Sequence, residues 1–258
     1  MDLGLSGKNA LVCASTAGLG LAIAEALSTE GARVVISGRR EERAREIASR
    51  LPRSVAVPCD VTAPGAAQQL VRESKEALNG DIDIVVLNGP GPKAGTAAGL
   101  SAGDLRAAIE TLLIFQQEVA ELLLPGMCAR GWGRVLSVGS SGVLEPIPNL
   151  VLSNVGRSAL AAYLKTLAGE VAGDGVTVNM LLPGRIDTDR VRALDNARAQ
   201  REGRAAADVA ADSASSLPVG RYGSPAEFGA IGAFLCSQQA GYITGSAIRC
   251  DGGMSHRL

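Results

Sequence analysis

The sequence predicts a doubly wound α/β fold, in which an open parallel sheet carries helices on both faces. Short runs of apolar and β-branched residues alternate with longer segments of helical period along the chain. The short runs are apolar throughout, as expected for strands that are covered on both faces. With 258 residues, of which 47% are hydrophobic, the chain can bury one large core, so a single domain over residues 1–258 is predicted.

The expected strands and helices can be placed along the chain by these two patterns. The strand-like runs are 9–13, 33–37, 55–57, 82–87, 134–138 and 176–181, with a last short strand near 246–249. The helical segments are at about 19–30, 41–51, 65–79, 101–129, 150–172 and 225–237. Right-handed crossovers between parallel strands then fix the winding. Segment 187–216 is rich in Ala, Arg, Asp and Ser, which predicts a helical insertion over the open end of the sheet that acts as a substrate lid.

The charge balance argues against polyanionic partners. Lys plus Arg number 25 and Asp plus Glu number 26, so the formal net charge of -1 gives no overall positive field for nucleic acid or an anionic membrane. No basic region precedes an apolar run at the N-terminus, and no uncharged apolar stretch reaches the roughly 18 residues of a membrane span. We therefore expect a cytoplasmic protein with neither nucleic-acid nor membrane partners.

The cysteines and the histidine restrict the chemistry further. The five cysteines have no CxxC spacing, which favours buried, reduced, structural thiols over disulfides, a metal site or a nucleophile. They are Cys13, Cys59, Cys128, Cys236 and Cys250. His256 is the only histidine and lies near the end of the chain, which argues against a Ser-His-Asp mechanism and against a histidine-rich metal site. No metal is expected.

The turn after the first strand is the first candidate binding site. It is built of small residues and runs directly into an apolar helix. Small residues let backbone amides approach a pyrophosphate, which then lies at the positive N-terminus of the helix. Such turns also arise for packing reasons, but the position in the first β-α unit favours dinucleotide binding. The candidate residues are Ser15, Thr16, Gly18, Leu19 and Gly20.

The end of the second strand predicts which dinucleotide binds. An acidic residue at this place takes the adenosine ribose hydroxyls, whereas arginine accommodates a 2'-phosphate. Gly38 occupies the acidic position, and Arg39 and Arg40 follow it. The residues therefore favour NADP(H) over NAD(H). The alternative is that the two arginines are solvated residues at the start of a helix.

Together these segments resemble the short-chain dehydrogenase/reductase family, over essentially the whole chain. Three further motifs resemble the family's adenine-contacting Asp-Val step, its Asn-Asn-Ala-Gly segment and its Pro-Gly-x-Ile-x-Thr stretch beside the nicotinamide. Their residues here are Asp60 and Val61; Asn88 and Gly89; and Pro183, Gly184, Ile186 and Thr188. Segments 242–245 and 251–253 are similar to the family's closing strand and subunit contact. The resemblance implies a Rossmann-type domain in which these residues bind the cofactor.

The catalytic positions of the family are occupied differently here. The family uses a Tyr one helical turn before a Lys, with a Ser upstream and an Asn on an earlier helix. Aligned by the resemblance, Ser140 matches the Ser, while Ser153, Arg157 and Leu112 stand at the Tyr, Lys and Asn positions. Ala14 replaces the first Gly of the turn, and Leu87 replaces the first Asn of the Asn-Asn-Ala-Gly segment. The chain resembles a divergent branch related to 3-oxoacyl-carrier-protein reductases.

These departures weaken the proton donor but keep groups that can hold an oxygen. An alkyl hydroxyl such as that of Ser153 is a much weaker acid than a phenol. Helical spacing places Ser153 and Arg157 on one face, where Arg157 can bind a ribose or polarise an oxygen but will not release a proton. Ser140 can donate to a carbonyl oxygen. It is equally consistent with the sequence that Ser153 and Arg157 only pack on an interface helix.

The sequence thus predicts an NADP(H)-dependent oxidoreductase acting on a small carbonyl or secondary alcohol, with Ser140, Ser153 and Arg157 as candidate catalytic residues. Two alternatives remain open: a non-catalytic NADP(H)-binding or partner-subunit protein, and a non-redox elimination or isomerisation on the same fold. The segment 150–172 carries small and apolar residues on more than one face, which predicts a homo-oligomer. The family resemblance implies a dimer or tetramer.

Overall fold

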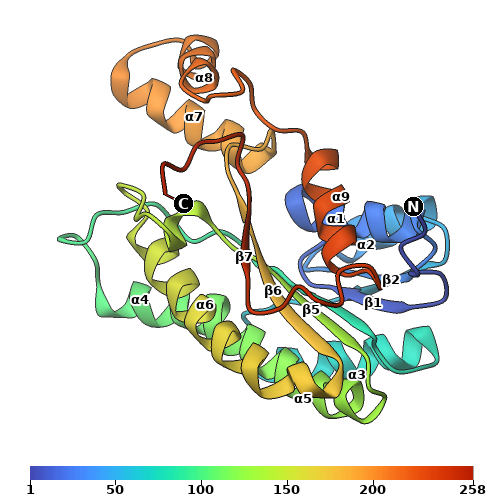
Figure 1. The fold of residues 1–258 in the computed structure, drawn as a ribbon. Coiled ribbons are helices and arrows are strands. Elements are labelled where there is room, and N and C mark those ends of the chain that lie inside the picture. Colours follow the sequence, from blue (N-terminus) through green and yellow to red (C-terminus); the bar gives the residue numbers. More distant parts are fainter. Residues whose placement is uncertain (258) are drawn as a thin grey trace.

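The seven strands form one parallel sheet in the order β3-β2-β1-β4-β5-β6-β7 (Figure 1). The computed structural model describes residues 1–257. The strands are β1 (Asn9–Val12), β2 (Arg33–Gly38), β3 (Ser54–Pro58), β4 (Ile84–Leu87), β5 (Gly133–Val138), β6 (Val176–Pro183) and β7 (Ala247–Cys250). The order reverses between β1 and β4, and such a switch point is where open α/β sheets bind ligands. The predicted single-domain, doubly wound fold is confirmed.

Helices cover both faces of the sheet (Figure 1). On one face lie α1 (Gly18–Thr29), α2 (Glu41–Arg50) and α9 (Pro225–Leu235). On the other lie α3 (Ala66–Leu78), α5 (Phe115–Ala129) and α6 (Val151–Val171). Before α5 come α4 (Ala102–Ile109) and the π-helical turn η1 (Glu110–Ile114), and two short 3-10 turns, η2 (Ser141–Val143) and η3 (Ala172–Asp174), flank α6.

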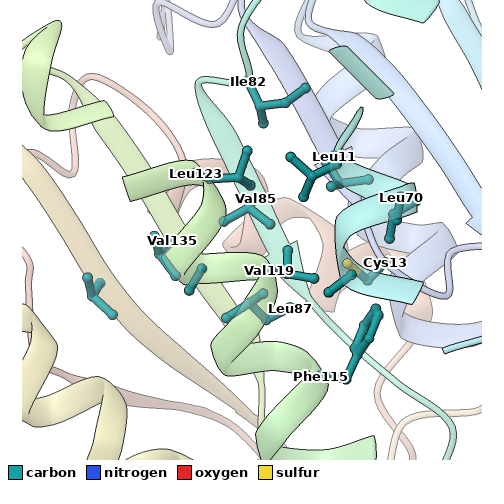
Figure 2. Close-up of a cluster of buried hydrophobic side chains, with 14 of the residues drawn as sticks. Leu11, Cys13, Leu70, Ile82, Val85, Leu87, Phe115, Val119, Leu123 and Val135 are labelled. Carbon is teal, nitrogen blue, oxygen red and sulfur yellow. The ribbon is translucent and has the colours of Figure 1, made fainter. Parts of the chain in front are cut away.

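The core lies in two layers, one on each side of the sheet. Figure 2 shows the layer beneath α3 and α5, where Leu11, Val85 and Leu87 of the strands meet Phe115 and Val119 of α5. Burying each such side chain stabilises the fold by about 2 kcal/mol relative to leaving it in water. The strands contribute to both layers because successive side chains point to opposite faces. The strand ends that form the site therefore rest on a core that is packed from two sides.

The predicted helix 101–129 is present but contains the wider turn η1. Thr111 Oγ1 donates to the carbonyl oxygen of Ala107 at 3.1 Å, and such back-bonding by a hydroxyl bends helices. Within residues 1–257 this helix, Ala102–Ala129, is the one that is long and apolar enough to cross a membrane, and 44% of the tested stretch is buried. Its inner face, with Val119 and Leu123, belongs to the core layer shown in Figure 2, as in core helices of globular proteins.

The segment 187–216 forms two helices, α7 (Asp189–Glu202) and α8 (Ala206–Ser215), which pack against each other and stand clear of the sheet in Figure 1. A polar contact anchors α7 at its inner side. The buried Asp195 pairs with Arg185 Nη1 at 2.5 Å and accepts a hydrogen bond from Tyr222 Oη at 2.8 Å. The anchor ties α7 to the two chain segments that flank the α7–α8 pair.

Candidate active site

A cavity of about 810 Å³ lies at the carboxyl ends of the strands. Its walls come from the segments that follow β1, β2, β3, β4, β5 and β6, together with the start of α6 and the first turns of α7. Parallel strands bring these distant segments to one edge of the sheet. The cavity therefore brings most of the sequence stretches that carried the family resemblance together around the switch point, whereas segments 242–245 and 251–253 do not line it.

Most of the residues that the sequence singled out line this cavity. They are Thr16, Gly18, Leu19, Arg39, Arg40, Asp60, Val61, Asn88, Gly89, Ser140, Ser153, Arg157, Pro183, Gly184, Ile186 and Thr188. Ser15 and Gly20 are not among its lining residues. Ser15 is fully buried, and its Oγ donates to the Val12 carbonyl at 2.8 Å and accepts from the Ser37 amide at 3.0 Å. Its side chain therefore joins the ends of β1 and β2 beneath the cavity.

Asn88 holds the turn after β1 from the side of β4. Its Nδ2 donates to the carbonyl oxygens of Cys13, at 3.2 Å, and Ala14, at 3.1 Å. A Cβ on Gly20 would stand 2.6 Å from that Nδ2 and 2.9 Å from the Ala14 oxygen, so only glycine fits at this place. Asn88 and Gly20 thus act on the shape of the turn, and Ala14 adopts a left-handed φ of +47° within it.

The N-terminus of α1 opens into the cavity with its backbone amides unpaired by side chains. Ala17 is the N-cap and provides no side-chain hydrogen bond, and the first turn carries no acidic residue. Ala17, Gly18 and Leu19 all line the cavity. Free amides and the positive end of the helix dipole form a site suited to an anion.

The cavity wall at the end of β2 carries two arginines and no acid on that strand. A Cβ on Gly38 would approach Thr16 Cγ2 to 2.7 Å, so the Thr16 side chain fills the place beside the glycine. Arg39 and Arg40 follow and are exposed at the cavity edge. Opposite them, hydrogen bonds from Thr62, with a further contribution from Arg39, hold the pKa of Asp60 below its ordinary value.

Ser140, Ser153 and Arg157 come together at the other end of the cavity. Ser140 lies just beyond β5, and its Oγ accepts from the Gly142 amide at 3.0 Å, which leaves its own proton available to a ligand. Ser153 is in the first turn of α6, and Arg157 lies one turn later and donates to the Val138 carbonyl. Burial, and to a smaller degree Arg190, lower the pKa of Arg157 to about 10, so it is a cation at neutral pH.

The π-helical turn η1 packs an apolar residue against α6, next to this part of the site. Leu112, at the centre of η1, is fully buried. A Cβ on Gly156 would lie 2.8 Å from Leu112 Cδ1, so α6 passes close to η1 immediately before Arg157. Leu152 packs in the same small cluster. Leu112, which stands at the position of the family's Asn in the resemblance, therefore packs against α6 and does not line the cavity.

Arg190 is a cavity residue that sequence reasoning missed. It is the second residue of α7, and its Nη2 donates to the Pro92 carbonyl, in the loop after β4, at 2.7 Å. A cation in the first turn of a helix opposes the helix dipole. That unfavourable position, two residues after Thr188, was the sequence signal available for it.

The prediction of buried cysteines is correct for Cys13 and Cys236, whereas Cys59, Cys128 and Cys250 are partly exposed. All five are free. Burial raises the pKa of Cys13 to about 12 and, with nearby acidic side chains, that of Cys59 to about 11. Neither forms a thiolate at neutral pH. Within residues 1–257 the His, Cys, Asp and Glu side chains form no group of three or more that could hold a metal ion.

The sheet order, the switch-point cavity and the anion-ready helix end define a Rossmann-type α/β protein. Residues 13–255 match the family model described as Enoyl-(Acyl carrier protein) reductase. Dehydrogenase/reductase SDR family member 4 of Sus scrofa is 35% identical, over 98% of this chain and 89% of its own. 3-oxoacyl-acyl-carrier-protein reductase FabG of Salmonella typhimurium is 31% identical, over 98% and 99%.

A solved structure agrees with these relatives over the whole chain. L-Sorbose reductase from Gluconobacter frateurii, complexed with NADPH and L-sorbose, has a TM-score of 0.94 and 33% sequence identity, covering 100% of both chains. The chain therefore belongs to the short-chain dehydrogenase/reductase family.

Proposed function

We propose that the protein is an NADP(H)-dependent oxidoreductase that acts on a small carbonyl compound or secondary alcohol. The observation that carries this proposal is the layout of the cavity, with an anion site at α1, two arginines at the end of β2, and Ser140 with Arg157 at the far end. The similarity to a sorbose reductase that binds NADPH supports it.

The residues present fit NADP(H) better than NAD(H). Thr16 occupies the space beside Gly38, so there is no carboxylate at the strand end to accept hydrogen bonds from a ribose diol. Arg39 and Arg40 instead supply cations suited to a 2'-phosphate. The residues that would hold the cofactor are Thr16, Gly18, Leu19, Arg39, Arg40, Asp60, Val61, Asn88, Gly89, Pro183, Gly184, Ile186 and Thr188, with Ser15 and Gly20 shaping the turn.

Bound NADPH would supply the hydride for reduction of a carbonyl. Ser140 would donate a hydrogen bond to the carbonyl oxygen, on which negative charge grows in the transition state. Arg157 would orient and polarise that oxygen or bind a ribose hydroxyl, as a fixed cation that keeps its proton. Because Ser153 stands in place of the family's Tyr, the proton would come from water or through the ribose. The catalytic residues are in this sense atypical for the family.

One observation favours a non-catalytic, NADP(H)-binding role: the groups around Ser140 include no good proton donor for the oxygen of a reacting carbonyl. Among residues 1–257, the lining side chains that follow β5 and begin α6 offer only the hydroxyls of Ser140, Ser141 and Ser153 and the guanidinium of Arg157 as proton-bearing groups. NADPH binding without turnover of any carbonyl compound would select that role. Turnover that needs no cofactor would select a non-redox reaction.

Further proposals concern the lid and the assembly. We propose that α7 and α8 form a substrate lid, since Val191 and Leu194 of α7 line the cavity.

We also propose a homo-oligomer, dimer or tetramer, because Leu122 of α5 and Val155 of α6 are large apolar side chains that are 38% and 41% exposed. Light scattering tests the oligomer by comparing the measured mass with the 26.3 kDa of one chain. We also propose a cytoplasmic location.

The test of the proposed cofactor is a fluorescence titration of NADPH and NADH. The wild-type protein should bind NADPH more tightly than NADH. Arg39→Ala should weaken NADPH by about 1.5 to 3 kcal/mol, since it removes a charge-assisted contact, and leave NADH nearly unchanged. Arg106→Ala, which removes an exposed arginine of α4 outside the cavity, is the matched control. Unchanged NADPH affinity in Arg39→Ala would contradict the assignment.

A further inference from the structure

Arg157 is a buried cation for which the protein provides no countercharge. Its side chain belongs to a residue that is 7% exposed, and its one hydrogen bond to the described residues goes to the Val138 carbonyl. No carboxylate of residues 1–257 accepts a hydrogen bond from it, and besides burial the positive charge of Arg190 lowers its pKa. Burying a charge is costly unless it is paired, and a like charge nearby increases that cost.

The acids of the cavity are engaged elsewhere. Asp60 and Asp189 are the acidic residues that line it. Asp60 stands at the end with Arg39 and accepts hydrogen bonds from Thr62 at 3.0 and 2.8 Å. Asp189 is an exposed residue that pairs with Arg192 at 3.1 Å. The far end of the cavity therefore carries two unneutralised guanidinium groups.

The placement of the two guanidinium groups favours an anion close to the reacting oxygen. Arg157 bonds to Val138, the last residue of β5, and Ser140 follows two positions later. Arg190 lines the same cavity from α7. It donates one hydrogen bond to the Pro92 carbonyl, and its other N–H donors remain free. Guanidinium donors form their strongest hydrogen bonds with carboxylates and phosphates.

We propose that Arg157 and Arg190 bind a carboxylate of the substrate, so that the protein acts on oxo acids and the corresponding hydroxy acids. This inference rests on the proposed function and names its substrate class. In the reaction, a hydride from NADPH adds to the carbonyl carbon and a proton from water adds to its oxygen, giving the hydroxy acid and NADP+. The carbonyl oxygen lies at Ser140 while the carboxylate is held beside it.

The same cations could instead meet a phosphate of the cofactor. Thr188, directly before α7, lies near the α1 N-terminus, because a Cβ on Gly18 would stand 3.9 Å from Thr188 Cγ2. Arg190 is two residues further on. The test must therefore measure the acid and the cofactor separately.

The experiment compares acids with their neutral methyl esters by calorimetry. Pyruvate and acetoacetate, each against its methyl ester, are titrated into the protein with and without NADP+. The acid should bind about 10- to 100-fold more tightly than its ester in the wild-type protein, as charge-assisted hydrogen bonds require. Arg190→Gln should remove most of this preference, and Arg201→Gln, an exposed α7 position outside the cavity, should not.

The buried Arg157 is tested after Arg190. The reason is that Arg157→Met can impair folding, whereas Arg190→Gln changes an exposed residue and should not. Arg157→Lys keeps the charge and should retain part of the preference. Equal binding of acid and ester, or no binding of either acid, would overturn the proposal. So would an Arg190→Gln variant that loses NADPH affinity but not acid preference, or one that weakens acid and ester alike. If the protein prefers the acids but does not oxidise NADPH with them, the result contradicts the proposed oxidoreductase function and supports the anion site.

Discussion

At the residue scale, the turn after β1 contains an alanine in a conformation that glycine adopts more easily. Ala14 adopts φ +47°, a left-handed conformation that costs an alanine roughly 1 to 2 kcal/mol. The Asn88 amide and the surrounding backbone hold it there. The binding turn is therefore strained at one residue.

Relief of this strain is measurable. Ala14→Gly should raise the free energy of unfolding by about 1 kcal/mol, because glycine takes the left-handed conformation without a steric penalty. Urea denaturation measures the change. Ala98→Gly, at an exposed loop position without positive φ, should change stability in the opposite direction. Equal destabilisation in both variants would show that the Ala14 conformation is not strained.

The two serines of the site should differ in their contribution to turnover. Ser140→Ala should lower kcat by about 100-fold or more, because it removes a donor to the oxygen on which charge develops. Ser153→Ala should have a small effect, since the hydroxyl is a poor acid. Steady-state kinetics with NADPH and any accepted carbonyl compound gives both values. Comparable losses would identify Ser153 as a working acid.

Residue-level prediction from the sequence worked where the backbone alone decides the position. Arg39, Ser140 and Arg157 follow or face strand ends, so their place at the cavity follows from the topology. Ser15 lies in the same turn, but its side chain points inward, which only the tertiary hydrogen bonds to Val12 and Ser37 reveal. Arg190 was missed because its partner, Pro92, is remote in sequence.

At the element scale, α1 and α9 are packed unusually closely, and this fixes the helix end that faces the cavity. A Cβ on Gly229 of α9 would stand 2.3 Å from the Ala22 carbonyl oxygen of α1. The start of α9 is secured by a capping box between Ser224 and Glu227, with Arg221 bonded to the same carboxylate. The cap thus supports the helix on which the α1 N-terminus rests.

The cap should give a recognisable pH dependence of stability. Hydrogen bonds from Arg221, and then from the Ser224 amide, lower the pKa of Glu227 from 4.5 to about 2. A depressed folded-state pKa stabilises the protein above pH 4.5, and this contribution is lost as the pH falls toward 2. Glu227→Gln should therefore lower Tm at neutral pH, and the difference from wild type should shrink toward pH 2. A constant difference would contradict the shift.

Element prediction succeeded for periodic segments and failed where local strain decides. The predicted helices and strands are present, with ends that shift by a few residues. The π-helical turn η1 was not predicted, because the hydrophobic period of 101–129 is compatible with an unbroken α-helix. Its position matters, since η1 packs Leu112 against Gly156 of α6, the residue before Arg157.

At the scale of the whole molecule, the fold was predictable because one physical requirement recurs in every strand. A sheet covered on both faces demands strands that are apolar throughout, and two core layers result. The chemistry of the site was less predictable, because it depends on which polar groups lack partners. The Asn88 Nδ2 donates to two backbone carbonyls, whereas the one hydrogen bond of the Arg157 side chain goes to a neutral carbonyl.

We propose that this cavity supports hydride transfer from NADPH to a carbonyl carbon. The most direct measurement uses NADPH deuterated at C4 of the nicotinamide, a panel of short aldehydes, ketones, ketoses and oxo acids, and mass spectrometry of the products. We expect deuterium on the carbinol carbon of at least one product, formed at a rate that falls sharply in Ser140→Ala. Saturable NADPH binding without deuterium transfer to any member of the panel would contradict it.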